Sequence, residues 1–172
     1  TLLGFRKRSD GSDIKLHVKQ DKLITRVGED KDALITDLLS DGYWNNSKMR
    51  KKDITFNAVV GNPPYQVGDG SGASDDAANP IYQEFVKVSQ ELQPQYVSII
   101  MPSKWMIGGK AVLKPFRKQM MEDRSISKLY DFENDQVIFP NAHNDGGICF
   151  FLWDKEYDGL TKYSFYPRGG NV

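Results

Sequence analysis

An asparagine, two prolines and a tyrosine stand together at Asn62-Pro63-Pro64-Tyr65, directly behind an apolar run that begins at Ile54. Each proline fixes φ near about −65° and lacks an N–H group, so positions 63 and 64 present carbonyl acceptors without competing backbone donors. The Asn62 side-chain oxygen and the Pro63 carbonyl oxygen can converge on one planar –NH₂ group and accept both of its hydrogens. The ring of Tyr65 can lie against the heterocycle that carries this amine.

Such a grip changes the chemistry of the amine. In an aromatic or amide –NH₂ group the nitrogen lone pair is delocalised and weakly nucleophilic. Holding both hydrogens draws the nitrogen towards a tetrahedral shape and frees the lone pair to attack a sulfonium methyl group. Catalysis of this kind depends on positioning and fixed dipoles and requires no strong base. The structural alternative for the same four residues is a proline-stiffened turn after a strand.

Four segments of the chain carry a resemblance to a known family. Residues Phe56 to Gln66 resemble motif IV of the S-adenosylmethionine-dependent DNA adenine-N6 methyltransferases, and the likeness is nearest to the methylase part of type II restriction–modification enzymes. Residues Asn79–Phe85 resemble the helix after the catalytic loop, Tyr96–Trp105 the next core strand with its Pro-Ser-x-Trp exit, and Val137–Lys155 the last hairpin. The likeness covers about residues 53–155, and only the tetrapeptide is highly specific.

The resemblance implies a fold, an activity and partners. The fold is α/β, a partial Rossmann-like methyltransferase fold in which a mostly parallel twisted sheet has flanking helices. The activity is transfer of a methyl group from S-adenosylmethionine to adenine N6 in double-stranded DNA, with the adenine flipped out of the helix. A restriction nuclease and a target-recognition domain, fused or separate, are the implied partners, in the bacterial cytoplasm.

Several residues outside the tetrapeptide are candidates for substrate binding. Phe139 corresponds by resemblance to an aromatic residue that closes the flipped-base pocket. Ser103, Lys104 and Trp105 follow the next core strand and border the same crevice, since open α/β sheets bind ligands at the carboxyl ends of their strands. Packing in the core is the alternative for Phe139 and the favoured interpretation of Trp105.

The cofactor motif of this family is not found in the chain. Nothing upstream of Asp53 matches its Gly-rich turn, and Gly68–Gly72 has neither a preceding strand nor a following helix, so we interpret that segment as a flexible lid or substrate loop. Cofactor-binding residues beyond the Asn62 region stay unassigned. Because the chain also opens on Thr1 without a methionine, we expect it to be a fragment that binds the cofactor weakly or not at all.

Composition limits the other roles. The chain has 172 residues, of which 23 are Lys or Arg and 23 are Asp or Glu, so the formal net charge is zero. Local basic clusters at residues 48–52 and 104–118 can contact DNA phosphates or face solvent, and we expect sequence recognition to lie outside the chain. No apolar run is long enough for a membrane span. His17 and His143 lack metal-ligand spacing, and the lone Cys149 is expected to be a buried small apolar residue.

Three segments describe the expected organisation. Residues 1–52 are hard to interpret, with a hairpin of strands 14–18 and 22–27 and a helix over 32–39. Residues 53–155 form the catalytic half, and 156–172 a tail or a link to a missing domain. The strands expected in the last two segments cover 54–60, 96–101, 126–132, 147–153 and 163–166, and the helices cover 80–93, with Asn79 as cap, and 111–121.

Two alternatives remain open. The tetrapeptide also occurs in protein glutamine-N5 and ribosomal guanine-N2 methyltransferases, although the Gly-rich segment and the Pro-Ser-x-Trp exit favour the restriction type. The second alternative is an inactive structural or DNA-contacting fragment when the chain is isolated.

Overall fold

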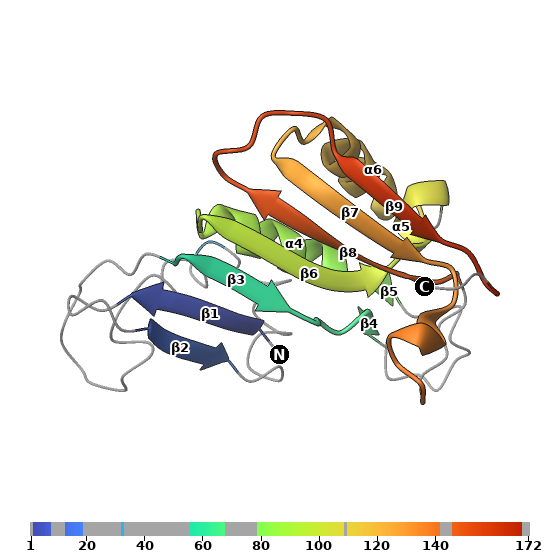
Figure 1. Ribbon diagram of the computed structural model, residues 1–172, viewed down its shortest axis with the longest axis horizontal. Helices are drawn as coiled ribbons and strands as arrows, with labels where there is room; N and C mark the ends of the chain where they lie inside the picture. The colour runs from blue at the N-terminus through green and yellow to red at the C-terminus, as the bar shows by residue number, and fades with distance from the viewer. Residues whose placement is uncertain are drawn as a thin grey trace.

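A computed structural model of the chain describes residues 2–7, 13–18, 32, 56–67, 79–108, 110–141 and 146–169. A seven-stranded sheet runs through these residues (Figure 1). In spatial order its strands are β2 (Asp13–Val18), β1 (Leu2–Lys7), β3 (Ala58–Gly61), β6 (Tyr96–Pro102), β8 (Ile148–Asp154), β7 (Ile126–Phe132) and β9 (Lys162–Tyr166).

Five of the seven strands run in one direction, and two run in the opposite direction. The pairs β3–β6 and β7–β9 are parallel, whereas β1 is antiparallel to both of its neighbours and so is β8. Strands β2, β3, β6, β7 and β9 therefore run in one direction, and β1 and β8 run against them. This mixed sheet with its flanking helices confirms the α/β class predicted from the sequence.

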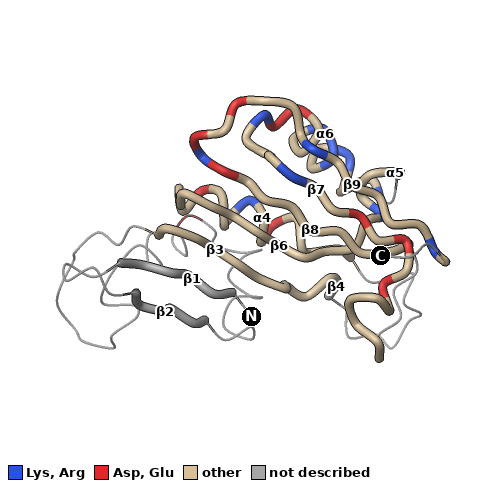
Figure 2. Tube along the Cα trace, in the orientation of Figure 1, with Lys and Arg blue, Asp and Glu red and all other residues tan. Residues whose placement is uncertain are grey.

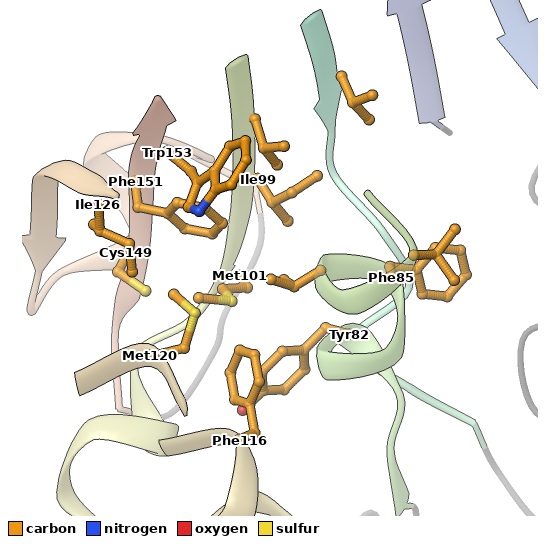
Figure 3. Packing of buried hydrophobic residues seen from close by; sticks show 14 of the residues in the cluster. Tyr82, Phe85, Ile99, Met101, Phe116, Met120, Ile126, Cys149, Phe151 and Trp153 are labelled. Atoms are coloured by element: carbon orange, nitrogen blue, oxygen red, sulfur yellow. The ribbon is translucent and has the colours of Figure 1, made fainter. Parts of the chain in front are cut away.

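Helices cover one face of the sheet. They are α4 (Tyr82–Glu91), α5 (Lys104–Ile107) and α6 (Leu113–Glu122). Alternate residues of β6 and β8, including Ile99, Met101 and Phe151, point to this face and are fully buried. Phe85 of α4 and Phe116 of α6 pack in the same cluster (Figure 3). The apolar residues that alternate along the strands thus pack against the apolar faces of the helices.

Aromatic rings stack on the opposite face. Tyr130 and Phe132, two residues apart on β7, both stack on Phe150 of β8, with ring centroids 4.9 and 5.9 Å apart respectively. Tyr166 of β9 stacks on Phe132 at 4.4 Å. These cross-strand contacts add to the pairing of β8, β7 and β9.

The entry into α4 differs from the prediction. Asn79 and Pro80 neither cap nor begin the helix; they form the short strand β5 (Asn79–Pro80), which pairs with β4 (Gln66–Val67). Ile81 is the N-cap residue, and its N–H donates to the Tyr65 carbonyl oxygen at 3.2 Å. Pairing with the segment after the tetrapeptide therefore outweighs the preference of Pro80 for the first helical position.

Most other elements of the catalytic half lie close to their expected bounds. Strand β7 matches the prediction, β6 and β8 differ by one residue at one or both ends, and α6 begins two residues later than expected. The predicted strand over 54–60 begins only at Ala58 among the described residues, and α5 was not predicted. Strand β9 contains the expected short strand over 163–166.

Only one of the two strands predicted for the N-terminal hairpin lies among the described residues. Strand β2 contains the predicted strand over 14–18, but the strand it pairs with is β1, which was not predicted. The expected partner over 22–27 lies outside the described residues. So do the Gly-rich segment at 68–72, the basic cluster at 48–52 and, except for the helical Asp32, the helix over 32–39. In the described ranges no helix is long and apolar enough to cross a membrane.

Replacement of Gly147 by alanine should destabilise the protein. Gly147 has a φ of +78°, and an added Cβ would collide with the backbone carbonyl oxygen of Phe132. We expect Gly147→Ala to lower the free energy of unfolding by more than about 2 kcal/mol, as measured by denaturant unfolding. Gly169→Ala is the matched control, because Gly169 has a φ of +82° but open space around it, and its cost should be about 1 kcal/mol. Equal losses in the two variants would contradict the steric argument.

Candidate active site

Asn62 follows β3 directly, at the carboxyl end of a strand that is parallel to its neighbour β6. Its side chain is exposed, whereas Pro63 is buried and Pro64 is half-buried. A buried proline beside an exposed amide fixes the turn in the protein and leaves the amide at the surface. This is the edge of the sheet where the strand-end argument placed the tetrapeptide.

Tyr65 connects the tetrapeptide to the core. Its ring is half-buried and packs against the main hydrophobic cluster. Its carbonyl oxygen accepts the hydrogen bond from the Ile81 N–H, and the next two residues of the chain form β4, which pairs with β5. The chain is therefore held on both sides of the tetrapeptide, by β3 before it and by the start of α4 after it.

Burial extends the pH range over which the Tyr65 phenol stays neutral. Loss of solvent raises the pKa of Tyr65 from 10.0 to about 12, with smaller contributions from Cys149 and from the Asp135 carboxylate. A neutral phenol presents an uncharged aromatic face at neutral pH, which suits contact with a base better than a phenolate does.

Phe139 follows a short 3₁₀ helix, η2 (Asp135–Val137), which is the next element after β7. Asp135 is 2% exposed, and its carbonyl oxygen accepts hydrogen bonds from the N–H groups of Ile138 and Phe139 at 2.9 and 2.8 Å. In Figure 1 the orange η2 turn lies toward the end of the sheet where β3 ends. The Phe139 side chain is only partly buried, so its ring has an open side.

Ser103, Lys104 and Trp105 have three different environments. Ser103 is buried, and its hydroxyl donates to Asp131 Oδ1 at 2.5 Å. Lys104 is exposed. The Trp105 ring is 1% exposed and its Nε1–H donates to Cys149 Sγ at 3.3 Å, so we assign it to core packing. Of the three, only Lys104 offers its side chain to solvent.

Cys149 has the character expected from the sequence. It is fully buried, and burial raises the pKa of its thiol to about 12. A thiol in this state is neutral at physiological pH and a poor nucleophile. Cys149 thus serves as a small apolar side chain next to the candidate site.

Three polar residues near this edge were not predicted from the sequence. Asp131 and Asp135 are both buried, and the Tyr163 hydroxyl donates to Asp131 Oδ2 at 2.7 Å. Asp131 carried a local signal, since it lies two residues after Leu129 on the face of β7 that packs in the core. An acidic residue at a position where the alternation predicts a buried apolar side chain indicates that its carboxylate has hydrogen-bond partners inside the protein.

The raised pKa of Tyr65 should appear in the pH dependence of stability. Above the ordinary value of 10.0 the unfolded chain loses a phenolic proton that the folded chain retains up to about 12. The free energy of unfolding should therefore fall as pH rises through this window. Tyr65→Phe removes one such group and should make the fall less steep in denaturant unfolding, with Tyr96→Phe as the matched loss of an exposed phenol. An unchanged slope in Tyr65→Phe would contradict the assignment.

Comparison with known proteins identifies the family. Residues 4–139 match the Eco57I restriction-modification methylase family. An uncharacterized adenine-specific methylase of Mycoplasma pneumoniae is 34% identical over 144 residues, which are 83% of this chain and 34% of that protein. The chain thus spans about a third of the length of this relative.

Two solved structures show a weaker likeness. A modification subunit assigned to a type I restriction enzyme from Vibrio vulnificus YJ016 has a TM-score of 0.45 and 11% identity, over 67% of this chain and 27% of that one. A type I methyltransferase subunit from Streptococcus thermophilus has a TM-score of 0.40 and 18% identity, over 67% and 26%. The sequence matches, by contrast, cover most of the chain and agree with the predicted resemblance. The chain belongs to the Eco57I restriction-modification methylase family.

Proposed function

We propose that the protein carrying this chain methylates adenine N6 in DNA as part of a restriction–modification system. The observation that carries the proposal is the placement of Asn62-Pro63-Pro64-Tyr65 at the carboxyl end of β3, with the amide exposed and the prolines anchored. The name of the Mycoplasma relative, an adenine-specific methylase, supports adenine over the glutamine and guanine alternatives. Assignment to type II remains part of this proposal.

The proposed role of the chain is to hold the amine. The Asn62 side-chain oxygen and the Pro63 carbonyl oxygen each accept one N6 hydrogen, which localises the lone pair on nitrogen and directs it out of the ring plane. No strongly basic side chain is required, because the extra proton on the methylated nitrogen is acidic and can leave to water. The contribution of the chain is positioning together with oriented dipoles.

S-adenosylmethionine, when bound, supplies an electrophilic methyl group. On the flank of β3 away from β6, the neighbouring strand β1 runs antiparallel to β3, so the last residue of β1 lies at the opposite edge of the sheet from Asn62. We therefore place most of the cofactor-binding residues outside the described part of the chain.

The adenine must leave the DNA stack to reach Asn62. Extrusion of a base costs a few kcal/mol, which stacking in the active site can offset. The half-buried ring of Tyr65 and the partly exposed ring of Phe139 are the proposed stacking surfaces. Both belong to segments that the described structure holds by backbone hydrogen bonds at Tyr65 O and Asp135 O.

Phosphate contacts are assigned to the helices that follow β6. Figure 2 shows several of the described Lys and Arg residues on α6. Lys114 and Lys118 are exposed and Arg117 is partly exposed, and none of the three forms an ion pair with a described residue. Lys104 adds an exposed charge at the start of α5. A target-recognition domain and a nuclease, fused or separate, complete the proposed system in the bacterial cytoplasm.

Loss of the Asn62 amide should impair catalysis much more than DNA binding. With the full-length protein and radiolabelled cofactor, Asn62→Ala should lower kcat for transfer to unmodified DNA by about 10²–10³-fold, the usual cost of losing one preorganised polar group. The Kd for DNA should change little. Asn57→Ala, an exposed asparagine at the other end of β3, is the matched control. Equal losses of kcat and affinity would contradict the amine-holding role, and label in release factor or ribosomal RNA but not in DNA would reject the proposed substrate.

Removal of the basic residues of α6 should weaken the salt dependence of DNA binding. The triple variant Lys114→Ala, Arg117→Ala, Lys118→Ala should reduce the slope of log K against log salt concentration by about 0.9 for each phosphate that the helix no longer neutralises. Binding titrations at several salt concentrations measure this slope. The control removes equal charge from exposed residues at the opposite edge of the sheet, namely Lys128, Lys155 and Lys162. The same change of slope in both triple variants would exclude a specific role of α6 in binding DNA.

A further inference from the structure

The carboxylate of Asp131 joins three separate segments at the edge of the sheet where Asn62 lies. Asp131 is the penultimate residue of β7 and is 8% exposed. Its Oδ1 accepts the Ser103 hydroxyl at 2.5 Å, and its Oδ2 accepts the Tyr163 hydroxyl at 2.7 Å. Ser103 lies in the turn between β6 and α5, and Tyr163 is on the edge strand β9. Each carboxylate oxygen therefore holds a different part of the chain.

This arrangement is a poor choice for stability alone. The two donors are neutral hydroxyls, and among the described residues no Lys, Arg or His forms an ion pair with Asp131. Removing a carboxylate from water without a cationic partner is costly. Its neighbours on this face are apolar: Leu129 precedes it by two residues on β7, and Cys149 is its register partner on β8. Apolar side chains at all three positions would avoid that cost, whereas an apolar residue at 131 alone would take the acceptor away from the hydroxyls of Ser103 and Tyr163.

The arrangement is well suited to holding the turn after β6. Ser103 is fastened twice, through its hydroxyl to Asp131 and through its N–H to the Gly147 carbonyl oxygen at 3.1 Å. The next residue, Lys104, is exposed. Since β6 is the parallel neighbour of β3 and Gly61 is in register with Ile99, this turn leaves the sheet at the same edge as Asn62, four residues beyond that register pair on β6.

The outer donor comes from a segment that the family match does not include. Strand β9 lies beyond residues 4–139, and it extends the sheet by pairing in parallel with β7. The Tyr163 side chain is 53% exposed, yet its hydroxyl reaches the buried carboxylate. Burial of the hydroxyl end and the bond to Asp131 raise the pKa of Tyr163 to about 12. The phenol therefore stays a protonated donor to higher pH than an ordinary tyrosine does.

We propose that Asp131 is a positioning residue of the active site, that it orients the Ser103 turn at the edge of the sheet where Asn62 lies, and that β9 completes this support through Tyr163. The inference rests on the proposed methyltransferase function and adds to it a residue and a strand that act without touching the substrate. Supporting groups of this kind hold a reactive geometry to within a fraction of an ångström. A displacement of about 1 Å can cost roughly a hundredfold in rate.

Paired tyrosine substitutions on β9 give the sharpest test. Tyr163→Phe deletes the hydroxyl that bonds Asp131, and Tyr166→Phe deletes a hydroxyl from the opposite face of the same strand, where the ring stacks on Phe132. In methyl transfer by the full-length protein, Tyr163→Phe should lower kcat roughly tenfold and leave the KM for DNA unchanged. Tyr166→Phe should change neither. Because each variant loses one oxygen atom from a partly exposed ring, both should fold.

A second experiment asks whether Ser103 and Tyr163 act through the same carboxylate. If they do, the first substitution already disturbs the Asp131 carboxylate, and the second adds little. The kcat of the double variant Ser103→Ala, Tyr163→Phe should then be clearly higher than the value obtained by multiplying the two single effects. Independent, multiplicative losses would overturn the proposal, as would equal kcat in Tyr163→Phe and Tyr166→Phe.

The same assays separate failure of this inference from failure of the proposed function. Absence of methyl transfer to adenine by the unsubstituted full-length protein would reject the function itself. Normal transfer with a tyrosine pair that behaves alike would reject only the role of Asp131. A purely structural role would show as a fall in the unfolding free energy of Tyr163→Phe without a change in kcat, and that result also overturns the proposal.

Discussion

The parallel pairing of β3 with β6 decides which residues can meet at the carboxyl edge of the sheet. Because Gly61 is in register with Ile99 and β6 continues to Pro102, Asn62 leaves the sheet beside a strand that extends past it. The antiparallel strand β8 enters at the same edge and borders β6 and β7 there. An exposed amide, a half-buried tyrosine and a fixed serine turn therefore lie at the same edge of the sheet, although α4 separates the tyrosine from the serine along the chain.

Rigidity at this edge comes from backbone contacts and buried polar groups more than from ion pairs. Tyr65 O holds the start of α4, Gly147 O holds the turn at Ser103, and Asp135 O holds the segment that carries Phe139. The backbone hydrogen bonds suit catalysis by positioning, since they fix geometry through neutral groups. The stacked rings on the other face of β7, β8 and β9 stabilise the strands that carry the buried carboxylate.

Patterns local in sequence predicted much of this architecture. The predicted strands over 96–101 and 126–132 and the predicted helix over 80–93 correspond to β6, β7 and α4 to within two residues at each end. What escaped prediction depends on partners distant in sequence. Pro80 has the features of a first helical residue but pairs with Gln66 instead, and β1 gives no local signal of its place beside β3. The hydrogen bond from Tyr163 to Asp131 joins residues 32 positions apart, so the apolar periodicity within either strand does not predict it.

The proposed chemistry requires two oxygen atoms, those of the Asn62 side chain and the Pro63 main chain, to hold one amine. An experimental structure of the full-length protein with cofactor analogue and target DNA would test this requirement through the distances from adenine N6 to these two oxygens. We expect a base outside the helix, with both distances between about 2.7 and 3.2 Å. An extruded base whose N6 contacts other groups, with either oxygen turned away from it, would show that the amine is held in some other way.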